Sequence, residues 1–270
     1  GQIRAVKANL RDDTSVATAL SGADAAINLV GILAPRGKQT FEAVQAEGAR
    51  RIARAARAEG IERFVQMSAI GADPDSDSEY ARTKAEGERH ALEAIPETVV
   101  VRPSIVFGPE DIFFNRFASI AKWSPAVPIV GGSTRFQPVF VGDVADFVAE
   151  AIDGKLAGGT TYELGGPEIK TFRELMQQML AEIGRKRQIV DLPLPVARLQ
   201  AKLMSVLPNP PLTLDQIKLL ARDNVVSAAA EAEGRTFRAA DLAPHSLAAI
   251  LPTYLWVYRS GGQFAPSNAS

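Results

Sequence analysis

A tyrosine and a lysine four residues apart, Tyr80 and Lys84, are the residues of this chain best suited to acid–base chemistry. Residues four apart on a helix share a face, so the Lys84 ammonium would favour the phenolate and lower a phenol pKa that starts near ~10. Ser68 ends a strand-like run twelve residues before Tyr80 and adds a hydroxyl for the same substrate. The pair by itself also fits an amphipathic helix with its aromatic residue inside and its lysine outside. Ser68, Tyr80 and Lys84 are therefore candidate catalytic residues, and their surroundings decide between the two interpretations.

Short apolar strands alternate with helical stretches around this group, which is the pattern of a parallel sheet covered by helices. Gly60 is a good stop signal for the long helix before the Ser68 strand. The acidic loop at 73–79 supplies capping residues for the helix that carries Tyr80. We therefore predict an α/β fold. The expected strands are 3–8, 25–30, 64–67 and 98–102, and the expected helices are 13–20, 40–59 and the one that carries Tyr80.

The regularity loosens beyond Gly108, where we expect a second lobe to begin. Thr171 and Thr213 each begin a capping box for a further helix. We place the first domain at 1–127 and a smaller C-terminal lobe, interleaved with the first, at 128–270. The other expected elements of this part are a helix at 112–123, a strand near 127–130, a helix opened by Asp143 and a strand at 161–167.

Composition places the chain among globular proteins and excludes several kinds of site. Its 270 residues are 46% hydrophobic, which is enough to bury the core of one large domain or slightly more. A net charge of −1 and a pI of about 6.2 argue against a nucleic-acid-binding protein. The absence of cysteine excludes disulfide and thiol chemistry, and only two histidines exclude a His-rich metal centre. No apolar run approaches the ~18 to 20 residues that cross a bilayer, so no transmembrane segment is expected.

Several motifs resemble the extended short-chain dehydrogenase/reductase family, in the order and rough spacing of that family. They are Asn28-Leu-Val-Gly31, Ser68, Tyr80-x-x-x-Lys84 and Arg102-Pro-Ser-Ile-Val-Phe-Gly-Pro109. More narrowly, the chain is similar over nearly its whole length to the atypical branch typified by the nucleotide-binding accessory subunit of respiratory complex I. The segments of this closer similarity are Gly71-Ala-Asp, Tyr80 to Gly87, Arg102 to Asp111, Arg135 to Val144, Tyr162 to Pro167 and Leu219 to Val225.

The resemblance implies a Rossmann-like parallel sheet with helices on both faces, and a bound nicotinamide nucleotide. The family's first strand and Gly-x-x-Gly-x-x-Gly turn, which wrap the cofactor pyrophosphate, are expected to lie outside these 270 residues. Residue 1 would then fall just before the third strand, and the segment that distinguishes NAD from NADP would also lie outside them. NADP(H) is the cofactor that the resemblance implies, and NAD(H) is the alternative.

The family's motif residues can be carried over one by one to cofactor-binding positions. Asn9 would lie beside the adenine, although an Asn at the end of a strand is often a turn former. The backbone around Gly31 would pass the adenosine ribose, where plain strand termination is the alternative interpretation. Lys84 would hydrogen-bond the nicotinamide ribose. The cofactor-binding set is Asn9 and Leu10 at the adenine, Leu29, Val30 and Gly31 at the ribose, Ser68, Tyr80 and Lys84, and Pro103, Ser104 and Ile105 beside the nicotinamide.

One departure from the family bears on catalysis. Active extended enzymes carry an Asn in a Val-Asn-x-x-Gly-Thr pattern, where it holds a proton-relay water near the lysine. This chain has Gln45 in that place, within Val44-Gln45-Ala-Glu47-Gly48. Whether the chain is an enzyme therefore stays open at this point, because Ser68, Tyr80 and Lys84 are kept but could serve to hold a nucleotide.

Two functions follow from these features. The first is an NAD(P)(H)-binding accessory or assembly subunit of the NADH:quinone oxidoreductase, in which the nucleotide is structural. Its partners would be the nucleotide and subunits of that complex, and it would lie peripherally on the cytoplasmic side of a bacterial inner membrane, or on the matrix side in mitochondria. The alternative is a cytoplasmic NAD(P)-dependent reductase, epimerase or dehydratase that acts on a small molecule or nucleotide sugar, with Tyr80 as acid and base.

Three further features are weaker, and two of them have a second interpretation. Asp143 is expected to cap a helix, with catalytic acid as the alternative. The run 250–258, with aromatics that include Trp256, is expected in the core of the second lobe, with a docking surface as the alternative. The Gly- and Ser-rich tail from Gly261 is expected to fray.

Overall fold

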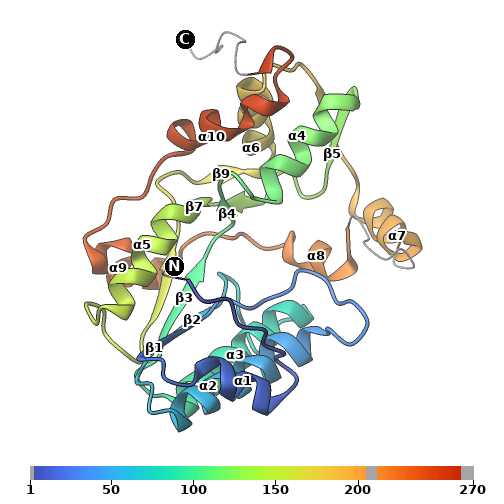
Figure 1. Cartoon of the computed structure of the whole chain (residues 1–270). Helices are drawn as coiled ribbons and strands as arrows, with labels where there is room; N and C mark the ends of the chain where they lie inside the picture. The colour runs from blue at the N-terminus through green and yellow to red at the C-terminus, as the bar shows by residue number, and fades with distance from the viewer. Residues whose placement is uncertain (1–2, 205–211, 263–270) are drawn as a thin grey trace. The chain divides into compact units, whose positions relative to one another are not determined.

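The computed structural model describes residues 3–204 and 212–262 (Figure 1). The chain forms two compact units that are interleaved in sequence, and each is described by itself. The expected domain boundary after residue 127 stays a prediction. Unit 1 comprises Gly1–Arg102, Asp146–Glu163 and Ala229–Ala240, and unit 2 comprises Pro103–Ala145, Leu164–Ala228 and Asp241–Ser270.

A four-stranded sheet forms the centre of unit 1, in the order β1-β2-β3-β8. Both β1 with β2 and β2 with β3 pair in parallel. The β2 and β3 segments are rich in Val and Phe and are buried on both faces, as expected for a parallel sheet that helices cover. The strands are β1 (Ala25–Asn28), β2 (Arg63–Met67), β3 (Val99–Pro103) and β8 (Thr161–Leu164).

Helices flank this sheet and close its core. Figure 1 shows α1, α2 and α3 side by side along one face, and a single apolar cluster joins Val16 of α1, Ile52 of α2 and Phe64 of β2. On α2 the small apolar residues face inward and the arginines outward, so its burial follows from its sequence pattern. The helices are α1 (Asp13–Leu20), the π-helix η1 (Glu42–Ala46), α2 (Glu47–Ala58), α3 (Glu79–Ala94), α5 (Val141–Ile152), α9 (Ala228–Ala232) and the 3-10 helix η2 (Phe237–Ala240). The predicted α/β fold, a parallel sheet flanked by helices, is confirmed.

Unit 2 has a separate core that is rich in phenylalanine. Phe113, Phe136 and Phe172 lie within ring contact of one another, and all pack in one cluster with α4, α6 and α10. Three short two-stranded ladders frame it: β4 (Val106–Phe107) with β7 (Val139–Phe140), β5 (Ala126–Ile129) with β10 (Gln188–Asp191), and β6 (Arg135–Phe136) with β9 (Lys170–Thr171). The helices are α4 (Phe113–Trp123), α6 (Phe172–Glu182), α7 (Leu194–Met204), α8 (Leu214–Leu219), α10 (Leu247–Leu255) and the 3-10 helix η3 (Trp256–Tyr258).

Both predicted capping boxes are present in unit 2. Thr171 caps α6 with Glu174 as its reciprocal partner, and Thr213 caps α8 with Gln216. This device is local, because each side chain satisfies a backbone N–H of the same first turn. The two helix starts were therefore predictable from a four-residue pattern.

The run 250–258 lies in the core of unit 2, as predicted. Leu251 and Leu255 are buried in the aromatic cluster. The Tyr254 hydroxyl donates to Asp111 Oδ2 at 2.6 Å, and burial together with this hydrogen bond raises the pKa of Tyr254. The Tyr258 hydroxyl donates to an Asn115 side chain of α4 at 3.0 Å. These tyrosines are therefore structural. The tail beyond residue 262 lies outside the described residues.

Two sequence predictions differ from the structure. The strand expected at 3–8 is wrong, because no described segment pairs with it, and Ile3 is 92% and Val6 48% exposed. The segment expected as a helix at 40–59 is helical over 41–58. It differs from the expectation only in its first part, η1, which is a π-helix whose backbone hydrogen bonds span five residues. Within the described ranges, no helix combines the length and the apolar composition that a membrane crossing requires.

Candidate functional site

Lys84 is a buried lysine on the inner face of α3. Ser78 caps this helix, its side chain accepting from Ala81 N, and so sets where Tyr80 and Lys84 fall on its turns. Lys84 is only 7% exposed, and its Nζ donates to the Met67 carbonyl at 3.2 Å. Burial lowers the pKa of Lys84 to about 8, although the Glu88 carboxylate opposes this shift. The protein thus holds a cation at a position that disfavours its charge.

Tyr80 lies one turn before Lys84 and packs edge-on against Phe41, with ring centroids 5.8 Å apart. Burial raises the pKa of Tyr80 to about 12. The sequence predicted the opposite direction from the charge of Lys84. The loss of solvation of the phenolate dominates instead, so Tyr80 stays a neutral phenol at physiological pH.

Ser68 presents a hydroxyl that the described protein leaves without a partner. Its backbone N–H donates to Val101 O at 2.7 Å, which fixes the residue at the end of the sheet. The Oγ atom is buried and has no hydrogen-bond partner within the described residues. A buried hydroxyl without a partner costs free energy, so a hydrogen bond from a bound molecule would stabilise it.

Gln45 occupies the place of the relay asparagine, and the protein uses both ends of its amide. Gln45 is buried within η1. Its Nε2 donates to Ile32 O at 2.9 Å, and the Thr83 hydroxyl donates to its Oε1 at 2.8 Å. An asparagine is one methylene shorter and could not span both partners. Gln45 therefore ties the loop after β1 to α3 rather than presenting an amide to a relay water.

A chain of buried amides leads from β1 to the lysine. Asn28 and Gln66 are register partners of β1 and β2, and Asn28 Nδ2 donates to Gln66 Oε1 at 2.9 Å. Gln66 Nε2 donates at 3.1 Å to the Met67 carbonyl, which also accepts from Lys84. At the other end, Val30 N donates to Asn28 Oδ1 at 3.1 Å, and this turn ends β1 at Asn28 instead of at residue 30. The amides thus fix the carbonyl that holds the lysine.

The backbone after this turn closes on the lysine. A Cβ added at Gly31 would lie 3.3 Å from Lys84 Nζ, so a side chain there would crowd the ammonium. Leu29 and Val30 are 63% and 40% exposed and leave open surface on the same segment. Gly31 and the Met67 carbonyl, next to Ser68 in the chain, therefore both lie at Lys84, with Tyr80 one turn away on α3. That these residues form one site stays a prediction. An ammonium and an unsatisfied hydroxyl beside an open backbone suit the hydroxyl groups of a ribose.

Asn9 and Leu10 come just before α1, and both side chains have contacts within unit 1. Asn9 forms a turn, because its Oδ1 accepts from Arg11 N at 3.2 Å and its N–H donates to Ser15 Oγ at 2.9 Å. Leu10 packs on α2, where its methyl group would lie 3.3 Å from a Cβ at Gly48. For Asn9 the turn-forming interpretation describes the side chain, and a role at the adenine stays a prediction for both residues.

Pro103, Ser104 and Ile105 begin unit 2. Ser104 Oγ lies 2.7 Å from Asn224 Oδ1 and accepts from Gln137 N at 3.3 Å. This hydroxyl is therefore used within unit 2. A role of the three residues beside a nicotinamide stays a prediction. Asp143, which we expected as a cap, accepts from His245 N at 2.7 Å, and its Oδ1 lies 2.6 Å from His245 Nδ1.

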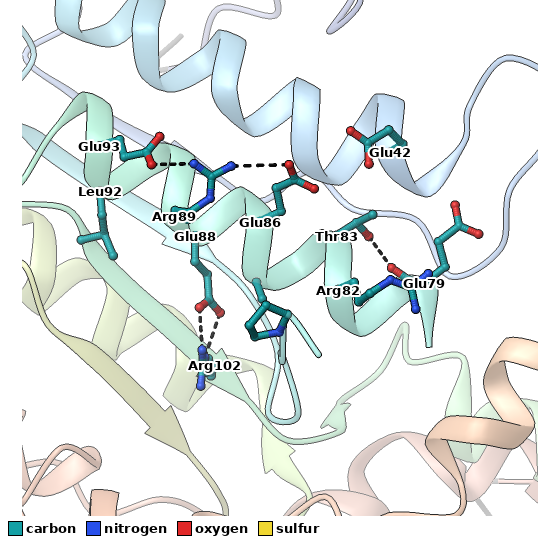
Figure 2. A pocket seen from close by; sticks show the side chains of 12 residues that line it. Glu42, Glu79, Arg82, Thr83, Glu86, Glu88, Arg89, Leu92, Glu93 and Arg102 are labelled. Atoms are coloured by element: carbon teal, nitrogen blue, oxygen red, sulfur yellow. Dashed lines mark hydrogen bonds and ion pairs between the residues drawn. The ribbon is translucent and has the colours of Figure 1, made fainter. Parts of the chain in front are cut away.

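A pocket of about 850 Å³ runs along the charged face of α3, and its lining contains neither Ser68, Tyr80 nor Lys84. Figure 2 shows Arg89 between Glu86 and Glu93, and Arg102 paired with Glu88. Arg89 lies 2.5 Å from Glu93, and Arg102 of β3 holds Glu88 by two hydrogen bonds of 2.8 and 2.6 Å. The second pair is bidentate and fastens α3 to the sheet. The Arg102–Glu88 pair therefore positions the helix that carries Lys84.

Sequence reasoning missed three residues of this arrangement. Gln66 donates to the Met67 carbonyl, which also accepts from Lys84, and Thr83 donates to the side chain of Gln45. Gly87 of α3 lets the helix approach η1, since a Cβ there would lie 2.5 Å from Gln45 O. The signals were a polar residue inside the apolar β2 segment and a glycine inside a helix, which costs stability unless the packing requires it.

Replacing Gln66 with leucine should lower the free energy of unfolding by about 1–3 kcal/mol, because the buried Asn28 amide would lose its acceptor. Urea unfolding of the two single variants and of the double variant Asn28→Leu/Gln66→Leu measures the coupling. We expect the double variant to cost less than the sum of the single variants by roughly 0.5–1.5 kcal/mol. Strictly additive costs would show that the two amides act independently.

Comparison with known proteins places this geometry in a family. Residues 1–100 match the NAD(P)H-binding family model, and residues 71–207 match the RmlD substrate binding domain. The NADH dehydrogenase [ubiquinone] 1 alpha subcomplex subunit 9 of Arabidopsis thaliana is 35% identical over 282 residues, covering 100% of this chain and 69% of that protein. The chain belongs to the family of this alpha subcomplex subunit 9.

A second relative and a solved structure agree with this membership. The NADH-ubiquinone oxidoreductase 40 kDa subunit of Neurospora crassa is 30% identical, over 98% of this chain and 69% of its own length. The structure of the Bordetella bronchiseptica enzyme WbmH in complex with NAD⁺ superposes with a TM-score of 0.69 at 16% identity, over 95% of this chain and 83% of that chain. At that identity it shows the fold alone. The resemblance inferred from the motifs is thus confirmed.

Proposed function

We propose that this protein is an accessory subunit of an NADH:quinone oxidoreductase that binds NADP(H) as a structural ligand and turns over no substrate. The observation that carries the absence of turnover is Gln45, whose amide is used at both ends by Ile32 and Thr83. In the active enzymes this position holds the water of a proton relay, and here the Gln45 amide bonds to protein groups instead.

The residues of the site fit a nicotinamide nucleotide. The unpartnered Ser68 hydroxyl and the Lys84 ammonium would hold ribose hydroxyls, and Gly31 would let the backbone approach them. Such a nucleotide supplies hydride transfer in enzymes, and the proposed function leaves this chemistry unused. What the protein would gain is stability, because a ligand that binds only the folded state shifts the folding equilibrium toward it.

Two parts of the proposal go beyond the site. They are the choice of NADP(H) over NAD(H) and the partner subunits. The relatives named above are, by name, NADH dehydrogenase and NADH-ubiquinone oxidoreductase subunits. We infer that this chain binds subunits of the corresponding complex and lies peripherally on the side of the membrane where NADH is oxidised. NADP(H) rests on the motif resemblance.

A second candidate function is a small-molecule reductase, epimerase or dehydratase. The observation that favours it is the intact group Ser68, Tyr80 and Lys84, in which the Ser68 hydroxyl is still available. A substrate oxygen could accept from Ser68 while Tyr80 donates its proton, with Lys84 beside it.

Tyr80→Phe separates the two functions. We expect it to leave nucleotide retention and melting temperature almost unchanged, because the phenol oxygen is not needed to hold a structural ligand. In a reductase the same change would lower turnover by roughly 10²- to 10⁴-fold. The measurement is NADPH absorbance with candidate carbonyl substrates, together with assay of the nucleotide released on denaturing the purified protein. A substrate-dependent absorbance change that disappears in Tyr80→Phe would refute the accessory function.

The partner part of the proposal is tested in the native host. The tagged protein should migrate on a native gel with NADH:quinone reductase activity after mild detergent extraction. If all of it runs as a free species, the accessory function fails whatever the nucleotide assay gives.

A further inference from the structure

Helix α7 of unit 2 buries its small residues and exposes its large ones. Ala197 and Ala201 are 0% and 1% exposed, whereas Val196, Leu199 and Leu203 are 50%, 60% and 68% exposed. An amphipathic helix of a globular protein normally turns its large apolar side chains to the core. Packing within the described part of unit 2 therefore does not explain the outward leucines of α7.

The outward residues form one stripe along the helix. Val196, Leu199 and Leu203 stand at positions i, i+3 and i+7, which place them on one side of α7. Arg198 and Lys202, four residues apart, lie along its edge and are exposed. The 11 residues of α7 include no acidic residue.

The sequence that leads into α7 and through it has a net positive charge, although the neighbouring helix α8 carries Asp215. The stretch 185–204 carries five basic residues and one acidic residue, Asp191, and Asp191 is already ion-paired with Arg173. Apolar side chains beside the stripe are also exposed, among them Leu194 at 42% and Leu214 of α8 at 45%. The surface is thus apolar in the middle and cationic at its edge.

We propose that α7 is an interfacial helix that lies in the plane of a membrane containing anionic phospholipids. Its aliphatic stripe would enter the boundary between headgroups and acyl chains, while Arg198 and Lys202 contact lipid phosphates. A protein partner fits less well, because protein interface hot spots are enriched in Trp, Tyr and Arg and depleted in Leu and Val. Charge complementarity selects an anionic surface over a neutral one.

The fold allows α7 to lie on such a surface without unfolding. Its inner face packs through Ala197 and Ala201 into a small cluster with Val130 and with Ile217 of α8. Figure 1 shows α7 as a short helix, and α8 is the next helix along the chain. The stripe is thus presented by a helix that is already folded, which avoids the entropic cost of folding a helix upon binding.

Vesicle flotation tests this proposal. The purified protein is mixed with vesicles of phosphatidylcholine alone, or of equal parts of phosphatidylcholine and phosphatidylglycerol. We expect it to float with the second kind, less so at high ionic strength. The double variant Leu199→Gln/Leu203→Gln should lower the partition coefficient by roughly 10- to 100-fold, and Arg198→Glu should lower it by roughly 10-fold on the anionic vesicles alone.

The matched control is Ile169→Gln, another exposed aliphatic residue of unit 2 at 53%, which should float like the unchanged protein. Because Leu199 and Leu203 face water, the double variant should keep its circular dichroism spectrum and melting temperature, so a loss of flotation reports the surface and not the fold. Absence of flotation for the unchanged protein, or equal flotation of the double variant, would overturn the proposal. Self-association that disappears in the double variant, without flotation, would identify a second copy as the occupant and would overturn it too.

Discussion

Replacing Lys84 with methionine should raise the free energy of unfolding of the nucleotide-free protein at neutral pH by about 1–3 kcal/mol, because it removes a buried charge while keeping an apolar chain of similar length. The basis is the burial of Lys84, which lowers its pKa to about 8 from the ordinary 10.5. The hydrogen bond to Met67 O is lost, but that carbonyl keeps the donor from Gln66. Urea unfolding measures the gain.

The stability gain expected for Lys84→Met depends on pH. Between about pH 8 and 10.5 Lys84 is neutral in the folded protein and protonated in the unfolded chain, so the unfolded state binds more protons and stability rises with pH. Below about pH 8 the penalty of the buried charge is present in full. The stability difference between the Lys84→Met variant and the unchanged protein should therefore be largest at pH 7 and should vanish near pH 10.5.

The same variant should lose its nucleotide. In the protein expressed from its natural gene, Lys84→Met should reduce the nucleotide released on denaturation and lower the melting temperature of the nucleotide-bound form, through lost ligand linkage. Lys155→Met is the matched control, because Lys155 is 58% exposed in a surface ion pair with Glu150 and such a pair contributes little to stability. A Lys84→Met variant that is destabilised without nucleotide would show that the ammonium holds the fold rather than a ligand.

Replacing Gly87 with alanine should destabilise the protein by about 2–4 kcal/mol, although alanine is the better helix former by ~1 kcal/mol. The added Cβ would lie 2.5 Å from the Gln45 carbonyl and 3.3 Å from Ala49 Cβ. Backbone cannot yield as a side chain can, so α3 would have to move away from η1. That movement would also stretch the hydrogen bond between Thr83 and Gln45.

Gly48→Ala is the matched control for this prediction. It is also a helical glycine of unit 1, but its added Cβ would meet the end of the Leu10 side chain at 3.3 Å, and that methyl group can shift. We expect its stability to change by less than ~1 kcal/mol in either direction. Equal effects of the two substitutions in urea unfolding would contradict the close approach of α3 to η1.

Local sequence patterns predicted much of the fold. The bounds of α1 at Asp13–Leu20 and the caps of α6 and α8 were predicted, since a helix start depends on side chains within its own first turn. The order of apolar strands and amphipathic helices predicted the parallel sheet. The expected strand at 3–8 failed because a strand also needs a partner, which its own residues do not encode.

The sequence by itself determined the chemistry available at the site and the family. It identified Ser68, Tyr80 and Lys84 by residue type and spacing, and it marked Gln45 as the departure from the active enzymes. Only the tertiary structure decided what these groups do, because pKa values and hydrogen-bond partners depend on burial and on residues distant in sequence. Burial raises the pKa of Tyr80, although the sequence predicted a lower one, and it lowers the pKa of Lys84. The fold bound the Gln45 amide at both ends, and among the described residues it left the Ser68 hydroxyl without a hydrogen-bond partner.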